Sequence, residues 1–169
     1  MLEHVQCSWT VLDEFIGRLS DAQMDRVGPD GWSVKDHLAH IAAWNLSLVA
    51  LLERRHRQAA MALEGFSTTD WDGQNEVLLG RYRGLVADEV GALVLGSCLM
   101  VVDALRGLSD AALMRPYREF QPQDMRTSFP TSDHPVWLWV VGTTEMHVEE
   151  HLEYIRAIIG SPEVTASLR

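Results

Sequence analysis

The chain has 169 residues, and its content of 47% hydrophobic and 22% charged residues is typical of one globular domain. A formal net charge of -10 argues against nucleic acid or an anionic membrane surface as the main partner, because both attract proteins rich in Lys and Arg. The N-terminus lacks the apolar run of a secretory signal, and no stretch is long and apolar enough to span a bilayer, so we expect a cytoplasmic protein.

The spacing of apolar residues predicts an all-α protein, because it follows the helical period and nowhere the alternation of a strand. Ser33 is expected to cap the second long helix, with Asp36 completing a capping box. Shorter helices are expected over 71–81 and 110–114. The predicted long helices cover about residues 3–19, 33–56, 84–108 and 135–159. Four such helices predict a four-helix bundle, with residues 1–169 as a single domain and 160–169 as a frayed tail.

The longest irregular stretch, residues 115–134, contains three prolines and three aromatic residues. A loop of this length inside a compact domain is usually functional or disordered. Its aromatic content favours a packed lid, which could close over a pocket. Pro135 suits the start of the last helix, because its missing N–H costs nothing there.

The last predicted helix carries an HxxxH motif, His147 and His151, which places two imidazoles on one helix face. On a helical wheel started at Val136 both fall within the apolar face, so both are expected to point into the bundle. Each unmade hydrogen bond of a buried imidazole costs about 1–3 kcal/mol. A metal ion that binds one nitrogen of each ring meets that need, and a hydrogen-bonded pair in the core is the alternative interpretation.

A third ligand is sought on the second predicted helix, which offers His37 and His40. On a wheel started at Val34, His37 lies about 60° from the centre of the apolar stripe and His40 about 120°. Burial alone therefore favours His37, and the i, i+3 spacing would also let both rings approach one site. The other histidines are expected to be solvated or to lie in loops: His4, His56 and His134.

Residues 31–44, with the sequence GWSVKDHLAHIAAW, resemble the second-helix signature of the DinB/YfiT-like superfamily. The continuation through Trp71, Asn75 and the Arg-Tyr-Arg run at 81–83 is similar to the ClbS/DfsB branch of that superfamily. It is also similar to the N-domains of mycothiol-dependent maleylpyruvate isomerases. The resemblance covers most of the chain, from about residue 5 to residue 159.

This resemblance implies a four-helix bundle with an up-down-down-up arrangement, often in a homodimer. The family's metal triad has one histidine late in the second-helix signature and two in the last helix. Residue by residue these fall on His40, His147 and His151, with His37 as a reserve ligand. Members of the wider family carry zinc or nickel, and some branches dispense with the metal. ClbS-like proteins are resistance proteins that open a strained electrophilic ring in a genotoxin.

Three neutral imidazoles would leave a divalent ion with an open position for water, a low-molecular-weight thiol or a substrate oxygen. Such a site suits attack on a small electrophilic molecule, so we expect a metal-dependent hydrolase or thiol-S-transferase. The alternative is a non-catalytic protein that binds a small molecule or protects against stress or a toxin, with a structural metal or none. An open position beside a pocket favours the enzyme, whereas a fourth ligand such as His37 favours the binding protein.

No catalytic residue is assigned from the sequence. Glu145 and Glu150 lie near the histidines in sequence; at best they would contact the metal ligands, and they are more simply interpreted as surface charges. Aromatic and amide side chains are expected to line a pocket above the metal, with plain core packing as the alternative. These candidates are Trp44, Asn45, Trp71, Asn75, Trp137 and Trp139.

Overall fold

The computed structural model describes residues 1–65, 70–121 and 133–160, and within these ranges it contains helices and no strand. This confirms the predicted all-α class. The long helices are α1 (Leu2–Ile16), α3 (Val34–Leu52), α6 (Ala87–Arg106) and a composite last helix, in which α8 (Val136–Val141) leads through the π-helical η3 (Gly142–Met146) into α9 (His147–Gly160). The shorter elements are α2 (Asp21–Met24), α4 (Arg57–Ala60), α5 (Trp71–Tyr82), α7 (Asp110–Leu113) and the 3-10 helix η1 (Tyr117–Glu119).

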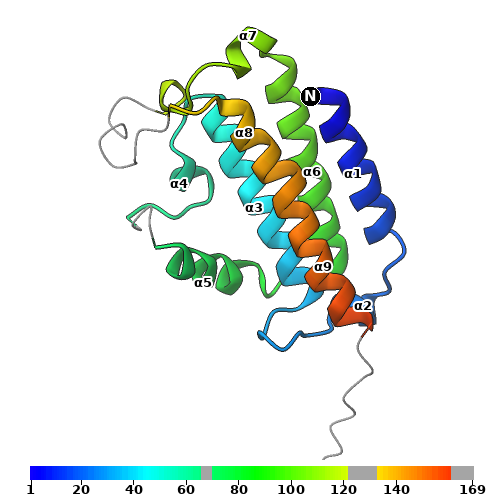
Figure 1. Cartoon of the computed structure of the whole chain (residues 1–169). Helices are drawn as coiled ribbons and strands as arrows, with labels where there is room; N and C mark the ends of the chain where they lie inside the picture. The colour runs from blue at the N-terminus through cyan, green and yellow to red at the C-terminus, as the bar shows by residue number, and fades with distance from the viewer. Residues whose placement is uncertain (66–69, 122–132, 161–169) are drawn as a thin grey trace, which may run out of the picture.

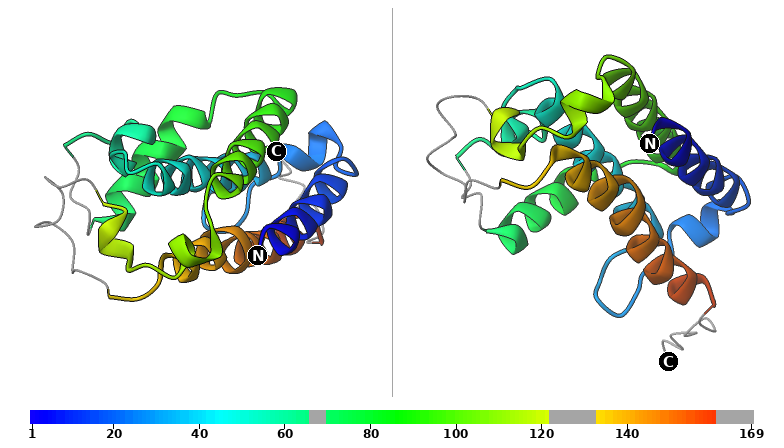
Figure 2. Two further views of the ribbon diagram at one scale, coloured as in Figure 1. Left: turned by 90° about the horizontal axis from the view of Figure 1, so that it is seen from above. Right: turned by 45° about the horizontal axis from the view of Figure 1, so that its top comes forward.

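The long helices lie side by side, with α3 at the centre of the molecule (Figure 1). In that view α1 and the α8–α9 helix run downward, whereas α3 and α6 run upward. The short helices α4 and α5 cover the side of α3 that faces away from α1, as both Figure 1 and Figure 2 show. Helix α3 therefore has neighbours on all sides, and 16 of its 19 residues are buried.

The start of α3 follows the predicted capping box. The Ser33 Oγ accepts a hydrogen bond from the Asp36 backbone N–H at 3.2 Å, and the Asp36 Oδ2 accepts one from the Ser33 backbone N–H at 2.8 Å. Two free N–H groups of the first turn are thus satisfied. The helix ends at Leu52, earlier than the expected residue 56, because Arg54 adopts a left-handed conformation with φ of 57°.

The last helix departs from the prediction of one regular α-helix. Residues 142–146 form a π-helical turn, in which each residue rotates the chain less than the 100° assumed for the helical wheel. The Thr144 hydroxyl in this turn donates to the Val140 carbonyl of α8 at 2.8 Å. A wheel started at Val136 therefore loses its phase before it reaches His147. Gly160, expected just beyond the helix, is its last helical residue.

Within the residues that the structure describes, no helix combines the length and the apolar character needed to cross a membrane. The homodimer and the cytoplasmic location are not tested by the fold and stay predictions.

Candidate metal centre

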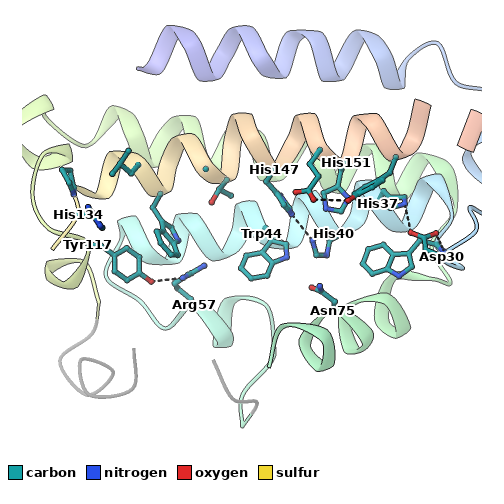
Figure 3. A pocket seen from close by; sticks show the side chains of 18 residues that line it. Asp30, His37, His40, Trp44, Arg57, Asn75, Tyr117, His134, His147 and His151 are labelled. Carbon is teal, nitrogen blue, oxygen red and sulfur yellow. Dashed lines mark hydrogen bonds and ion pairs between the residues drawn. The ribbon is translucent and has the colours of Figure 1, made fainter. Parts of the chain in front are cut away.

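Three histidines from two helices meet inside the bundle, as expected from the resemblance. His40 comes from the middle of α3, and His147 and His151 come from successive turns at the start of α9. Each offers one ring nitrogen, and these three nitrogens lie within 4.8 Å of one another. His40 is 5% exposed and His151 is 7% exposed. Figure 3 shows the rings of His40 and His147 facing each other across the space between the two helices.

The closest approach in this triad joins the Nε2 atoms of His40 and His147, which lie 3.1 Å apart. Two imidazole nitrogens at this distance need a proton or a cation between them, because their lone pairs repel. Nitrogens bound to one zinc ion at about 2.0–2.1 Å lie roughly 3.3 Å apart in a tetrahedral site. The Nδ1 atoms of the same two rings are buried without a hydrogen-bond partner. A hydrogen-bonded pair alone thus satisfies these rings poorly, and the donor set fits a divalent metal ion.

Burial keeps all three rings neutral at physiological pH. It lowers the pKa of His40 to about 3 and that of His151 to about 2, with smaller contributions in the same direction from the neighbouring histidines. It also lowers the pKa of His147 to about 4, although the Glu150 carboxylate opposes this shift. A neutral imidazole keeps a lone pair, so these rings are in the form that binds a metal.

His37, the reserve ligand, lies outside the group of three. Its Nδ1 lies 2.9 Å from the Nδ1 of His151, close enough to share one proton. Its Nε2 lies 3.7 Å from the Asp30 Oδ2, and burial lowers the pKa of this ring as well. If the Nδ1–H of His151 donates to the Nδ1 of His37, the Nε2 of His151 keeps its lone pair. The proton of the neutral His37 ring then lies on its Nε2, which faces Asp30. Histidines that bind metals are commonly oriented by such partners.

A cavity of about 780 Å³ opens beside the triad, between α3, the α8–α9 helix and the short elements α4, α5 and η1. Trp44 and Asn75 line it as expected, and the Asn75 Oδ1 is buried there without a hydrogen-bond partner. Trp139 also lines the cavity, as expected. Trp137, the other tryptophan candidate on α8, packs against the hydrophobic core and is not among the cavity residues.

One of the other polar predictions needs correction. Asn45 is fully buried on the far side of α3, where its Nδ2 donates to the Ser97 Oγ at 3.1 Å, so it is not a pocket residue. Glu150 is exposed, as expected of a surface charge, and it also lines the cavity and accepts a hydrogen bond from the Tyr154 hydroxyl at 3.1 Å. The side chain of Trp71 lies outside the described part of the chain.

The opposite end of the cavity was not predicted from the sequence. Arg57 on α4 extends into it, and its Nη1 donates to the Tyr117 hydroxyl at 2.8 Å (Figure 3). His134, expected to be a loop residue, also lines this end. Within the expected lid, residues 115–121 and 133–134 are described and include Tyr117, whereas 122–132 lie outside the described ranges. No periodic signal marks Arg57, because its helix has only four residues and begins just after the predicted end of the second helix at residue 56.

Comparison with known protein families finds a match for the sequence of this chain. The family model described as the DinB superfamily matches residues 5–155, which is most of the chain. No curated protein and no solved structure matches the chain significantly.

Proposed function

Since the chain belongs to the DinB superfamily, we propose that it is a metal-dependent enzyme that acts on a small electrophilic molecule, as a hydrolase or a thiol-S-transferase. One observation carries this proposal. The ligand nitrogens of His40, His147 and His151 lie within 4.8 Å of one another, and all three residues line a cavity of about 780 Å³. A cavity of this size accepts a small organic molecule next to the histidines.

The number of converging histidines supports a catalytic site over a structural one. Catalytic zinc sites commonly have three protein ligands, whereas structural sites have four. His37, the obvious fourth candidate, is engaged with His151 at 2.9 Å. Imidazole suits both zinc and nickel, so we propose one of these as the resident ion. When bound, the ion would supply a Lewis acid that lowers the pKa of a water or a thiol, which makes a nucleophile available at neutral pH.

The surrounding residues of this chain orient a substrate and exclude water from it. Trp44 lies against the triad, with its ring centre 5.9 Å from that of His40 and 6.1 Å from that of His147. An indole at this position offers a flat apolar surface next to the reacting atoms. The buried Asn75 Oδ1 offers an acceptor to an N–H or O–H group of a bound molecule.

The metal content of the purified protein tests the first half of the proposal. We expect about one equivalent of zinc or nickel in the wild type, and its loss in His147→Ala and in His151→Ala. His56→Ala is the matched control, because His56 is exposed and is not among the cavity residues. A wild type without metal, or unchanged metal content in both triad variants, would remove the proposed centre.

Turnover of an electrophile before and after chelation of the metal tests the proposed catalytic activity. The metal-loaded protein is mixed with an epoxide or an activated ester, with and without a low-molecular-weight thiol. A rate that requires the thiol supports the transferase, and a rate without it supports the hydrolase. Equal rates after chelation would defeat a catalytic role of the metal. Tight metal binding without turnover of any electrophile would favour the alternative, a small-molecule binding or toxin-protection protein.

A further inference from the structure

At the end of the cavity away from the triad, the positive charge of Arg57 faces neutral groups. Its Nε donates to the Ser47 Oγ and its Nη1 to the Tyr117 hydroxyl, each at 2.8 Å. Its Cζ lies 5.6 Å from the ring centre of Trp139 and 5.9 Å from that of Trp44. The described residues give this guanidinium no carboxylate partner and leave its Nη2 without an acceptor. A half-buried cation held in this way attracts an anion.

Arginines elsewhere on the molecule show that such pairing is readily available. The chain has 24 acidic residues against 14 lysines and arginines. Six arginines form ion pairs with carboxylates in the described residues: Arg18, Arg55, Arg106, Arg115, Arg118 and Arg156. Arg57 is the only lysine or arginine in the wall of the cavity, as far as the structure describes that wall. Because Arg57 lies in the cavity wall, a bound ligand can supply the negative charge that the described residues do not.

The charged groups of the wall are separated along the cavity. Asp30 lies at the histidine end, with its Oδ2 3.7 Å from the His37 Nε2. Glu150 lies at the same end, because it accepts a hydrogen bond from Tyr154, whose ring stacks on His37 at 5.6 Å. The cavity is thus negative beside the histidines and positive at Arg57, so an anionic ligand is oriented with its charge toward Arg57.

Trp44 connects the two ends (Figure 3). The same indole lies 5.9 Å from the Arg57 Cζ and 6.1 Å from the ring centre of His147. One flat molecule lying along this indole can therefore contact the guanidinium at one end and the triad at the other. Aromatic rings stack on indoles with additional stabilisation beyond the buried area.

We propose that Arg57 binds the carboxylate of a small aromatic acid, whose ring lies along Trp44 and whose uncharged electrophilic end reaches the triad. A carboxylate fits better than a phosphate, because a phosphate dianion calls for more than the single cation that the described wall provides. The assignment of the reactive end rests on the proposed function, whereas the carboxylate subsite requires no metal. Arg57 thereby acts as a specificity-determining residue.

Calorimetric titration of the full chain with two matched probes tests the subsite. The probes are 2-naphthoate and its neutral isostere 2-naphthamide, which differ in charge and hardly in size. We expect the wild type to bind the carboxylate at least about tenfold more tightly than the amide, as for a hydrogen bond to a charged group. Arg57→Gln should abolish this preference, and Arg57→Lys should keep part of it, because lysine retains the charge and loses the planar fork.

Arg54→Gln is the matched control. Arg54 belongs to the same segment and also lies over an aromatic ring, at 5.5 Å from the centre of Phe120, but it is not among the cavity residues. Its replacement should leave the preference for the carboxylate unchanged. A purely structural role of Arg57 would make Arg57→Gln weaken both probes equally, and that result overturns the proposal.

Three other results would also overturn it: no binding of 2-naphthoate at millimolar concentration, equal binding of both probes by the wild type, or tighter Arg57-dependent binding of 2-naphthyl phosphate than of 2-naphthoate. The same titration with His147→Ala separates this subsite from the metal centre. A retained preference in that variant supports the Arg57 site even if the proposed metal chemistry fails.

Discussion

The two ends of the cavity differ in charge, in burial and in the elements that carry them. The histidine end is built on the long helices α3 and α9, and its three rings are neutral because burial lowers each pKa. The arginine end is built on α4, η1 and α8, and it keeps a permanent positive charge. One end therefore offers lone pairs to a cation, and the other offers N–H donors to an anion.

This difference shows how one small cavity can fix the direction of a ligand. Neutral imidazoles select an electron-pair acceptor, whereas a guanidinium selects an electron-pair donor. A molecule that carries both kinds of group has one favourable orientation between the two ends. We therefore expect that changes at one end of the cavity leave the properties of the other end intact.

The largest expected effect is a loss of folding stability at acidic pH. The pKa values of His40, His147 and His151 in the folded chain, about 3, 4 and 2, lie below the ordinary value of 6.5. Below pH 6.5 the unfolded chain binds protons that the folded chain does not, so the metal-free protein keeps its stability above pH 6.5 and loses it as the pH falls toward these values. We expect a loss of about 1.4 kcal/mol per pH unit for each proton taken up on unfolding, measured by urea denaturation at pH 7.5 and 5.5.

Variants from both ends serve as controls for this acid sensitivity. Arg57→Gln should show the same slope as the wild type, because the guanidinium stays charged throughout this range. His147→Ala should show a shallower slope, since one titrating group is gone. An unfolding free energy that does not change between pH 7.5 and 5.5 would show that the buried rings are not held neutral.

The next largest effect is expected at His37. His37→Ala removes the partner that lies 2.9 Å from the His151 Nδ1, while it leaves all three proposed ligands in place. We expect a metal affinity about 10–100-fold lower than that of the wild type, measured by competition with a chromogenic chelator. Complete loss of metal would make His37 a ligand itself, and an unchanged affinity would make its contact with His151 incidental.

A smaller effect is expected at the arginine end from Tyr117→Phe. Tyr117 is 1% exposed, and its hydroxyl accepts the hydrogen bond from Arg57. We expect a loss of about 1 kcal/mol in the free energy of unfolding, with unchanged metal content. Tyr82→Phe is the control for loss of a hydroxyl from a packed ring. A change in metal affinity after Tyr117→Phe would contradict the independence of the two ends.

The smallest effect is expected for Asp30→Asn. The Asp30 side chain is 50% exposed and lies 3.7 Å from the His37 Nε2, so solvent screens its charge. We expect metal affinity to fall less than about threefold, in the same chelator competition. A loss as large as that of His37→Ala would mean that the carboxylate, and not the imidazole, orients His151.

Much of the fold was available from local sequence. The helical period predicted the long helices, and the Ser33–Asp36 capping box predicted where α3 begins. The HxxxH spacing of His147 and His151 fixed two proposed ligands on one face, since residues four apart stack on any helix. Periodicity and capping depend on neighbours within a few residues, and a single sequence displays these directly.

Tertiary structure decided which side chains share the cavity. Burial on a wheel ranked His37 above His40, but α3 is packed on all sides, so an amphipathic stripe could not rank them, and the choice of His40 came from the family resemblance. The π-helical turn at 142–146 shifted the phase of α9 relative to α8, and of the two tryptophan candidates on α8 only Trp139 lies in the wall, whereas Trp137 packs against the core. The arginine end required α4 and η1, which are far apart in sequence, to meet at one place. A sequence specifies the faces of each helix locally, whereas the rotation of one helix against another and the path of the connecting segments follow from packing over the whole chain.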